Sequence, residues 1–175
     1  MENIGQIKTL ISEADLKKRV EELAKQIYED YNKRSITFIC ILKGSVFFTV
    51  DLAKHIPSNV KLEFIRVSSY HGTESTGKIE LKIDLKDDIE GEDVLIIEDI
   101  VDTGRTLSYL KEYLKTKNPK SLKICTLLDK KERRVCEIEP EYVGFNIPDK
   151  FVLGYGLDVD EEYRNLPYIG YIDNV

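Results

Sequence analysis

Residues 94–107 read Val-Leu-Ile-Ile-Glu-Asp-Ile-Val-Asp-Thr-Gly-Arg-Thr-Leu, and this stretch decides the fold class. Its first four residues are apolar and mostly β-branched, which predicts a buried strand. From residue 106 to residue 117, leucines recur at every third or fourth position, which predicts a helix with one apolar face. A short turn that contains glycine joins the two. The stretch therefore predicts a strand–turn–helix unit of the kind that builds parallel sheets.

Strands and helices alternate on both sides of this unit. An amphipathic helix capped by Ser12 is expected to begin the chain, and a second helix is expected over residues 44–55. Apolar or alternating runs predict strands at residues 36–42, 61–67, 78–84, 121–128, 143–145, 151–153 and 168–172. Several of these strands are wholly apolar, so helices must cover both faces of the sheet. The sequence predicts an α/β fold with a mostly parallel central sheet, whose ligands bind beyond the carboxyl ends of the strands.

Composition narrows the classes of function. The chain has 175 residues, a length suited to one domain, and 26 Lys plus Arg against 32 Asp plus Glu leave a net charge of −6. An acidic chain is not expected to bind nucleic acid through its phosphates. No apolar run approaches the roughly 18 residues of a membrane helix, and the first six residues show no secretory signal. Three cysteines without a Cys-x-x-Cys pair favour a reducing, cytoplasmic location.

Three carboxylates follow the apolar run of the decisive stretch, namely Glu98, Asp99 and Asp102. The turn after them opens a helix, and the free N–H groups of a helix start form an anion site, for which phosphate is the usual ligand. An ordinary helix cap would explain one acid and one hydroxyl, but not three acids at the end of a buried strand. Acids beside a phosphate need other targets, such as sugar hydroxyls or Mg²⁺. The motif itself therefore suggests a phosphorylated ribose as the ligand.

This motif resembles the phosphoribosyl-diphosphate (PRPP) signature of the type I phosphoribosyltransferases, which is two apolar residues, Glu-Asp, two apolar residues and then Asp-Thr-Gly-x-Thr. Further segments narrow the resemblance to the hypoxanthine-guanine phosphoribosyltransferases of bacterial type. They are Leu-Lys-Gly-Ser at 42–45, Ser-Ser-Tyr at 68–70, Leu-Leu-Asp-Lys at 127–130, Val-Gly-Phe-Asn-Ile-Pro at 143–148, Asp-Lys-Phe-Val-Leu-Gly-Tyr at 149–155 and Tyr-Arg-Asn-Leu-Pro at 163–167. These segments keep the family's order and span nearly the whole chain.

The resemblance implies a reaction and an architecture. The reaction is transfer of the 5-phosphoribosyl group from PRPP to N9 of hypoxanthine or guanine, with Mg²⁺ as cofactor, which yields IMP or GMP and pyrophosphate. The architecture is a single domain over residues 1–175, with its core at about 35–145 and a small hood from the N-terminal segment and about 146–175. The family generally forms dimers and tetramers, so a homo-oligomer is expected. Two alternatives stay open: a PRPP-binding regulator without catalysis, and a relative that prefers xanthine and guanine.

Family positions assign the PRPP site residue by residue. Asp102 matches the proton acceptor near N7 of the purine, where a carboxylate can take and return a proton as the charge of the ring changes. Glu98 and Asp99 match residues that hold the ribose hydroxyls and the associated Mg²⁺. The whole ribose-5-phosphate site is expected to comprise Glu98, Asp99, Asp102, Thr103, Gly104, Arg105 and Thr106.

The flanking segments supply the pyrophosphate site and the lid. Lys43, Gly44 and Arg164 match residues that bind pyrophosphate, and the family often has a cis peptide before the residue that matches Lys43. Ser69 and Tyr70 match the lid that closes over the site, within a polar loop at residues 68–77.

The purine site is assigned in the same way. Lys130 matches the lysine that donates to the purine O6, whereas the charged stretch 130–134 by itself predicts a solvated loop. Phe151 matches the aromatic that stacks on the purine, although its position is equally compatible with core packing, and Val152 matches the residue whose backbone reads the base edge. Asp158 matches a Mg²⁺-linked carboxylate on the purine side. The expected metal ligands are therefore Glu98, Asp99 and Asp158.

Overall fold

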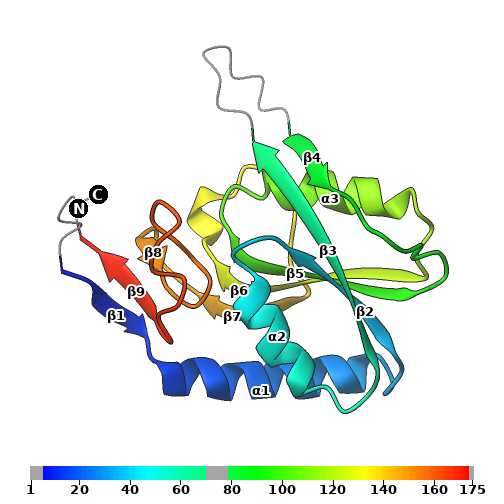
Figure 1. Cartoon of the computed structure of the whole chain (residues 1–175), viewed down its shortest axis with the longest axis horizontal. Coiled ribbons are helices and arrows are strands. Elements are labelled where there is room, and N and C mark those ends of the chain that lie inside the picture. Colours follow the sequence, from blue (N-terminus) through cyan, green and yellow to red (C-terminus); the bar gives the residue numbers. More distant parts are fainter. Residues whose placement is uncertain (1–5, 70–78, 174–175) are drawn as a thin grey trace.

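The computed structural model describes residues 6–69 and 79–173 (Figure 1). Six strands form the main sheet in the spatial order β4-β3-β2-β5-β6-β7. Their bounds are β2 (Ile36–Ile41), β3 (Val60–Ser69), β4 (Ile79–Ile83), β5 (Asp93–Val101), β6 (Ser121–Asp129) and β7 (Tyr142–Asn146). Five strands run parallel, and only β4, at the edge, pairs antiparallel. The carboxyl ends of β2, β5 and β6 therefore meet at one edge of the sheet, where the fold predicts a ligand site.

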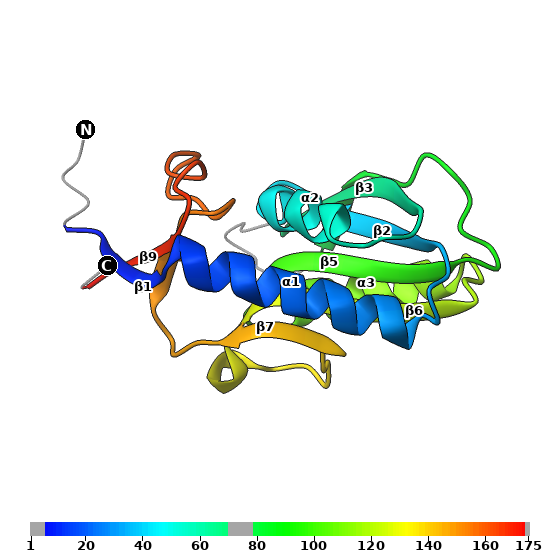
Figure 2. The ribbon, with the colours of Figure 1, turned by 90° about the horizontal axis from the view of Figure 1, so that it is seen from below.

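Helices cover both faces of this sheet. α1 (Glu13–Asp30) and α2 (Val46–Lys54) pack on one face, and α3 (Arg105–Lys115) packs on the other (Figure 2). Successive residues of the central strand point to opposite faces, so Leu95 joins the apolar cluster under α1 and α2 while Ile96 joins the cluster under α3. Burial of such a side chain stabilises the fold by roughly 1.5–3 kcal/mol. The wholly apolar strands are thus explained by a sheet with cover on each side.

A second sheet of three strands joins the two ends of the chain. β1 (Lys8–Ile11) pairs antiparallel with β9 (Ile169–Ile172), which pairs antiparallel with β8 (Phe151–Leu153). Figure 1 shows this small sheet beside the main one. The division into a core and a hood stays a prediction. The prediction that a helix begins the described part of the chain is wrong, because β1 precedes it. This strand depends on pairing with the far end of the chain, which local sequence does not reveal.

The start of α1 and the end of β5 differ in how closely they follow the local sequence. Ser12 caps α1 as predicted, and its Oγ accepts a hydrogen bond from the Asp15 N–H at 3.1 Å. β5, however, extends beyond the predicted apolar run, because its ladder with β6 continues to the pair Val101–Asp129. Backbone hydrogen bonds thus hold the first two acids of the motif inside a strand, and only the third acid follows it.

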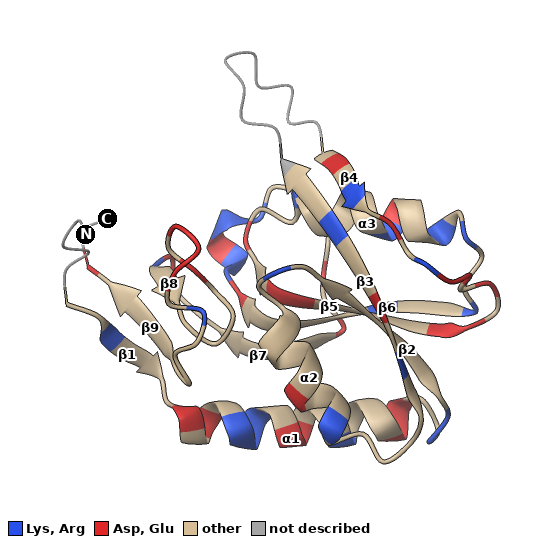
Figure 3. Ribbon diagram, viewed as in Figure 1, with Lys and Arg blue, Asp and Glu red and all other residues tan. Residues whose placement is uncertain are grey.

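Charged residues of both signs occur on the helices and loops of the fold, although Asp93, Glu98, Asp129 and Lys130 are buried. Figure 3 shows acidic and basic residues alternating along α1. None of the helices in the described ranges is long and apolar enough to cross a membrane. Of the two expected lid residues, Ser69 ends β3, and Tyr70 lies outside the described residues together with most of the expected lid loop.

Candidate active site

Two acidic residues lie next to each other within β5. The Glu98 side chain is buried, and burial, together with the neighbouring Asp99 carboxylate, raises the pKa of Glu98 well above its usual range. The Asp99 N–H donates a hydrogen bond to Glu98 Oε1 at 3.1 Å. A crowded carboxyl pair of this kind favours a ligand that brings hydroxyl donors or a cation.

The turn between β5 and α3 offers backbone donors to an anion. Gly104 is the N-cap of α3 with a φ of +81°, in the left-handed region that favours glycine, and it has no side chain to cap the helix. The Arg105 N–H donates a hydrogen bond to Thr103 Oγ1 at 3.5 Å. A Cβ on Gly104 would lie only 2.8 Å from Arg134 Cδ. A cavity of about 160 Å³ adjoins the turn. Its polar lining consists of Glu98, Asp99, Asp102, Thr103, Gly104 and Thr106, whereas Arg105 begins the helix and does not line it.

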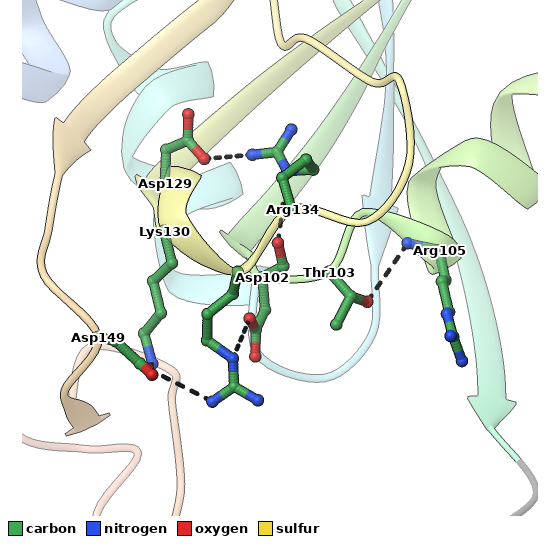
Figure 4. A network of polar contacts seen from close by, with 8 residues as sticks. Asp102, Thr103, Arg105, Asp129, Lys130, Arg134 and Asp149 are labelled. Carbon is green, nitrogen blue, oxygen red and sulfur yellow. Dashed lines mark hydrogen bonds and ion pairs between the residues drawn. The ribbon is translucent and has the colours of Figure 1, made fainter.

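Asp102 and Lys130 stand at the ends of two paired strands (Figure 4). The Lys130 N–H donates to Val101 O at 2.9 Å, which joins the end of β6 to the end of β5. The Lys130 side chain is only 8% exposed, with Nζ 3.5 Å from Asp149 Oδ1. Lys130 is therefore not part of a solvated loop, unlike the exposed Lys131 that follows it.

Two arginines that the sequence analysis did not single out surround Asp102. Arg133 Nε lies 2.9 Å from Asp102 Oδ1, and Arg133 Nη1 lies 3.3 Å from Asp149 Oδ1. Arg134 lies beneath the turn, where its Nε donates to Asp102 O at 3.3 Å and its guanidinium group pairs with the fully buried Asp129 (Figure 4). The only signal for either residue in the sequence is the basic run after β6, which usually means a solvated surface.

The expected pyrophosphate residues Lys43 and Arg164 converge on one acid. Lys43 Nζ lies 2.8 Å from Glu161 Oε2, and Arg164 Nη2 lies 3.1 Å from the same oxygen. These two cations lower the pKa of Glu161, Lys43 having the larger effect. Arg164 also pairs with Asp158 at 2.9 Å, and its buried Nε has no hydrogen-bond partner among the described residues. Glu161 was missed because an acid in an acidic loop carries no distinct signal.

Close backbone packing fixes the loop after β2. The peptide between Leu42 and Lys43 is cis. A Cβ on Gly44 would lie 1.7 Å from Asp99 Oδ2, and a Cβ on Gly156 would lie 2.0 Å from Gly44 O. Glycine is therefore required at position 156, where the neighbour is backbone and φ is +104°, whereas Gly44 leaves room for the side chain of Asp99. These contacts bring the loop after β2 against both the acidic strand β5 and the loop that carries Asp158.

Strand β8 of the small sheet carries the two residues expected to bind the base. Phe151 begins β8 and is 44% exposed, so its ring does not belong to the core, which was the other interpretation of its position. Val152, the next residue, is buried.

The expected metal ligands divide between two places. Glu98 and Asp99 lie in β5, whereas Asp158 pairs with Arg164 in the loop after β8. Over residues 6–69 and 79–173, no three acidic, histidine or cysteine side chains form a ready cage for a metal ion. Mg²⁺ commonly keeps several waters and binds one or two carboxylates together with substrate phosphates. The oxygen donors present therefore suit Mg²⁺ that arrives with an anionic substrate.

Comparisons with known proteins show which family this chain resembles over its length. The model of the phosphoribosyl transferase domain matches residues 7–160. A hypoxanthine-guanine phosphoribosyltransferase of Staphylococcus epidermidis is 52% identical over 162 residues, which are 92% of this chain and 90% of the relative. The crystal structure of a hypoxanthine-guanine phosphoribosyltransferase of Bacillus anthracis is 50% identical with a TM-score of 0.91, covering 95% and 99% of the two chains.

A more distant structure has the same fold. A hypoxanthine phosphoribosyl transferase of Trypanosoma cruzi, solved in a study of its C-terminal region, oligomeric state and activity, is 42% identical with a TM-score of 0.90. It covers 94% of this chain, which in turn covers 90% of it. On the domain match and on these identities over nearly its whole length, the chain belongs to the phosphoribosyltransferase family, in its hypoxanthine-guanine branch.

Proposed function

We propose that this protein moves the 5-phosphoribosyl group from PRPP to N9 of hypoxanthine or guanine, yielding IMP or GMP and pyrophosphate. The observation that carries the proposal is the hydrogen bond between Lys130 N and Val101 O, at 2.9 Å. This hydrogen bond joins the acidic PRPP motif to the buried Lys130. A site that bound only phosphate would not need a buried lysine at this place. A ligand that contacts both Asp102 and Lys130 must offer a ring nitrogen that can release a proton and an oxygen that accepts a hydrogen bond. A 6-oxopurine has both groups.

Each group of residues has a distinct task in this reaction. The backbone N–H groups and hydroxyls of the 103–106 turn bind the 5-phosphate, which suits a helix start whose N-cap is a glycine without a capping side chain. Glu98 and Asp99 accept hydrogen bonds from the ribose hydroxyls. Asp102 takes a proton from N7 as N9 bonds to the ribose, and Lys130 donates to O6, which favours oxopurines over adenine.

Lys43 and Arg164 bind the leaving pyrophosphate in this proposal, and both are ion-paired with Glu161 in the structure. Lys43 and Arg164 share Glu161 in this structure, so the carboxylate stands where a substrate anion would bind. The exposed pair between Lys43 and Glu161 contributes little stability, since such pairs are worth about 0–1 kcal/mol. A polyanion can therefore replace Glu161 at low cost.

Mg²⁺ is the proposed cofactor, with Glu98, Asp99 and Asp158 as its protein ligands. When bound, the ion neutralises charge on the leaving pyrophosphate. A cation beside Glu98 and Asp99 also offsets the crowding that raises the pKa of Glu98.

We further propose that two or more copies of this chain assemble, in the reducing environment of the cytoplasm. Four apolar side chains on α2 and β3 remain 41–42% exposed, and contact with a second copy would remove them from water; they are Phe47, Val50, Leu62 and Phe64. All three cysteines are free, which supports the proposed reducing environment. Sedimentation velocity is expected to show a dimer or tetramer at micromolar concentration, and a monomer there would contradict the assembly.

The direct test of the reaction is a pyrophosphate-release assay with purified protein, PRPP, Mg²⁺ and either hypoxanthine or guanine. We expect turnover with both bases, much less with adenine, and loss of turnover when EDTA removes the metal. Binding of PRPP without turnover on any purine would instead favour the regulator, and strong preference for xanthine would favour the other relative.

The role of Asp102 is tested by Asp102→Asn, which keeps the shape of the side chain and removes the proton acceptor. General acid–base catalysis is worth about 10²–10⁴-fold, so kcat is expected to fall about 100-fold or more while PRPP affinity changes little. Steady-state kinetics and PRPP titration measure the two effects. Near-normal kcat in the variant would rule out the acceptor role.

The contact of Lys130 with O6 is tested by Lys130→Ala, with Lys131→Ala as the matched control from the exposed neighbouring position. A hydrogen bond to a charged group is worth roughly 1.5–3 kcal/mol, so kcat/KM for hypoxanthine is expected to fall about 10- to 100-fold in the first variant. PRPP affinity is expected to stay close to normal in both. An unchanged purine KM in Lys130→Ala would argue against the contact.

A further inference from the structure

We propose that Arg133 is a positioning residue for the purine, which fixes the Asp102 carboxylate and, through Asp149, its spacing from Lys130. This inference rests on the proposed function and deepens it, because it adds a residue that determines how the base edge is read. Figure 4 draws the polar network around Asp102 and Lys130, the two residues proposed to contact the purine.

Four side chains form an unbroken chain of charges. Arg133 Nε lies 2.9 Å from Asp102 Oδ1, and Arg133 Nη1 lies 3.3 Å from Asp149 Oδ1. The same Asp149 oxygen lies 3.5 Å from Lys130 Nζ. Signs alternate along the chain, from acid to base to acid to base, so each member holds its neighbours. The two ends of this chain are the two groups proposed to meet the purine.

The two oxygens of Asp102 are not equivalent. Oδ1, on the side of Arg133, is buried and has no aligned hydrogen bond within the described residues, so its contact with Arg133 is an ion pair. The Asp102 side chain as a whole remains 39% exposed. A purine can therefore reach Oδ2, not Oδ1. Arg133 does not compete with the base, and instead turns the free oxygen toward it.

The backbone that carries Arg133 is anchored on both sides of the site. Arg133 ends a short 3₁₀ turn, η1 (Lys131–Arg133), and its N–H donates to Lys130 O at 3.1 Å. Two residues later, the Val135 N–H donates to Thr103 O at 3.0 Å. The turn is thus tied both to the lysine and to the phosphate-binding turn. Arg133 is presented to Asp102 from a fixed place rather than from a free loop.

Purine chemistry explains why this spacing matters. O6 and N7 lie on the same edge of a 6-oxopurine. Lys130 donates to one and Asp102 faces the other, so a shift of either group against its partner would weaken recognition of that edge. Arg133 suits the linking position because its guanidinium group presents several donors in a rigid plane, whereas a lysine can supply only a point charge.

The contacts of Arg133 are expected to affect kinetics more than stability. The Arg133 side chain is 47% exposed, and exposed ion pairs contribute about 0–1 kcal/mol to folding. Loss of the side chain leaves Arg134 to support the backbone of the turn. A variant at this position is therefore expected to fold normally. Its effect is expected in the kinetics with the purine and not in stability or PRPP binding.

The test compares Arg133→Gln with Lys131→Gln, which removes the same charge from the same turn. We expect Arg133→Gln to raise the KM for hypoxanthine about 10-fold and lower kcat, with the KM for PRPP and the melting temperature nearly unchanged. Arg133→Lys is expected to restore only part of the lost activity. Lys131→Gln is expected to leave the hypoxanthine kinetics unchanged. Hypoxanthine kinetics within twofold of the parent in Arg133→Gln, or an equal loss in Lys131→Gln, would overturn the inference.

A double-mutant cycle tests the link through Asp149. Because Arg133 and Asp149 act in one chain, Arg133→Gln and Asp149→Asn together are expected to cost little more than either alone. Fully additive losses would contradict the chain. The parent protein keeps the two proposals apart: no turnover in the parent contradicts the proposed function, whereas parent turnover with an unaffected Arg133→Gln contradicts only this inference. If Arg133→Gln melts early, Asp149→Asn provides the same kinetic comparison.

Discussion

The parallel pairing of β5 with β6 is the constraint on which the rest of the site depends. The ladder runs through the pair Val101–Asp129 and is continued by the hydrogen bond from Lys130 N to Val101 O. It carries an acidic motif and a basic loop, which are far apart in the sequence, to the same edge of the sheet. Asp102 follows one strand and Lys130 the other, so the proposed N7 and O6 contacts are held by backbone hydrogen bonds. Side-chain contacts then only need to refine the spacing.

Internal charge pairing explains how an acidic chain can hold anionic ligands. The few cations of the site already have acids beside them: Glu161 joins Lys43 and Arg164, and Asp149 joins Lys130 and Arg133. The pairs of Glu161 are partly exposed, so water screens them and an incoming phosphate can replace this acid, whereas Asp149 is proposed to hold its two cations in place. Asp129 with Arg134 is different, because it is buried and tied to backbone oxygens. One kind of pair is exchangeable, whereas the other is structural.

Glycines set the closeness of the loops. Gly44 lies against Asp99, Gly156 against Gly44, and Gly104 against Arg134. None of these glycines leaves room for a Cβ. At Gly156 the neighbouring atom belongs to the backbone of Gly44, so the loops after β2 and β8 meet at backbone distance. Such approach is needed where backbone N–H groups, rather than long side chains, are to bind phosphate.

Much of this protein could be predicted from its sequence because the signals are local. Apolar runs indicated the strands, helical periodicity and Ser12 indicated α1, and residues 98–106 together with the family segments indicated a phosphoribosyltransferase. The tertiary structure alone decided what depends on partners distant in sequence. It added β1, which needs β9, and the two acids of β5, which a ladder to β6 keeps in the strand. It also separated Lys130, buried at a strand junction, from the exposed Lys131, and gave Arg133 and Glu161 partners that no local pattern could indicate. A run of charges looks the same in a sequence whether it faces water or a carboxylate, because burial and ion pairing arise only when separate segments meet.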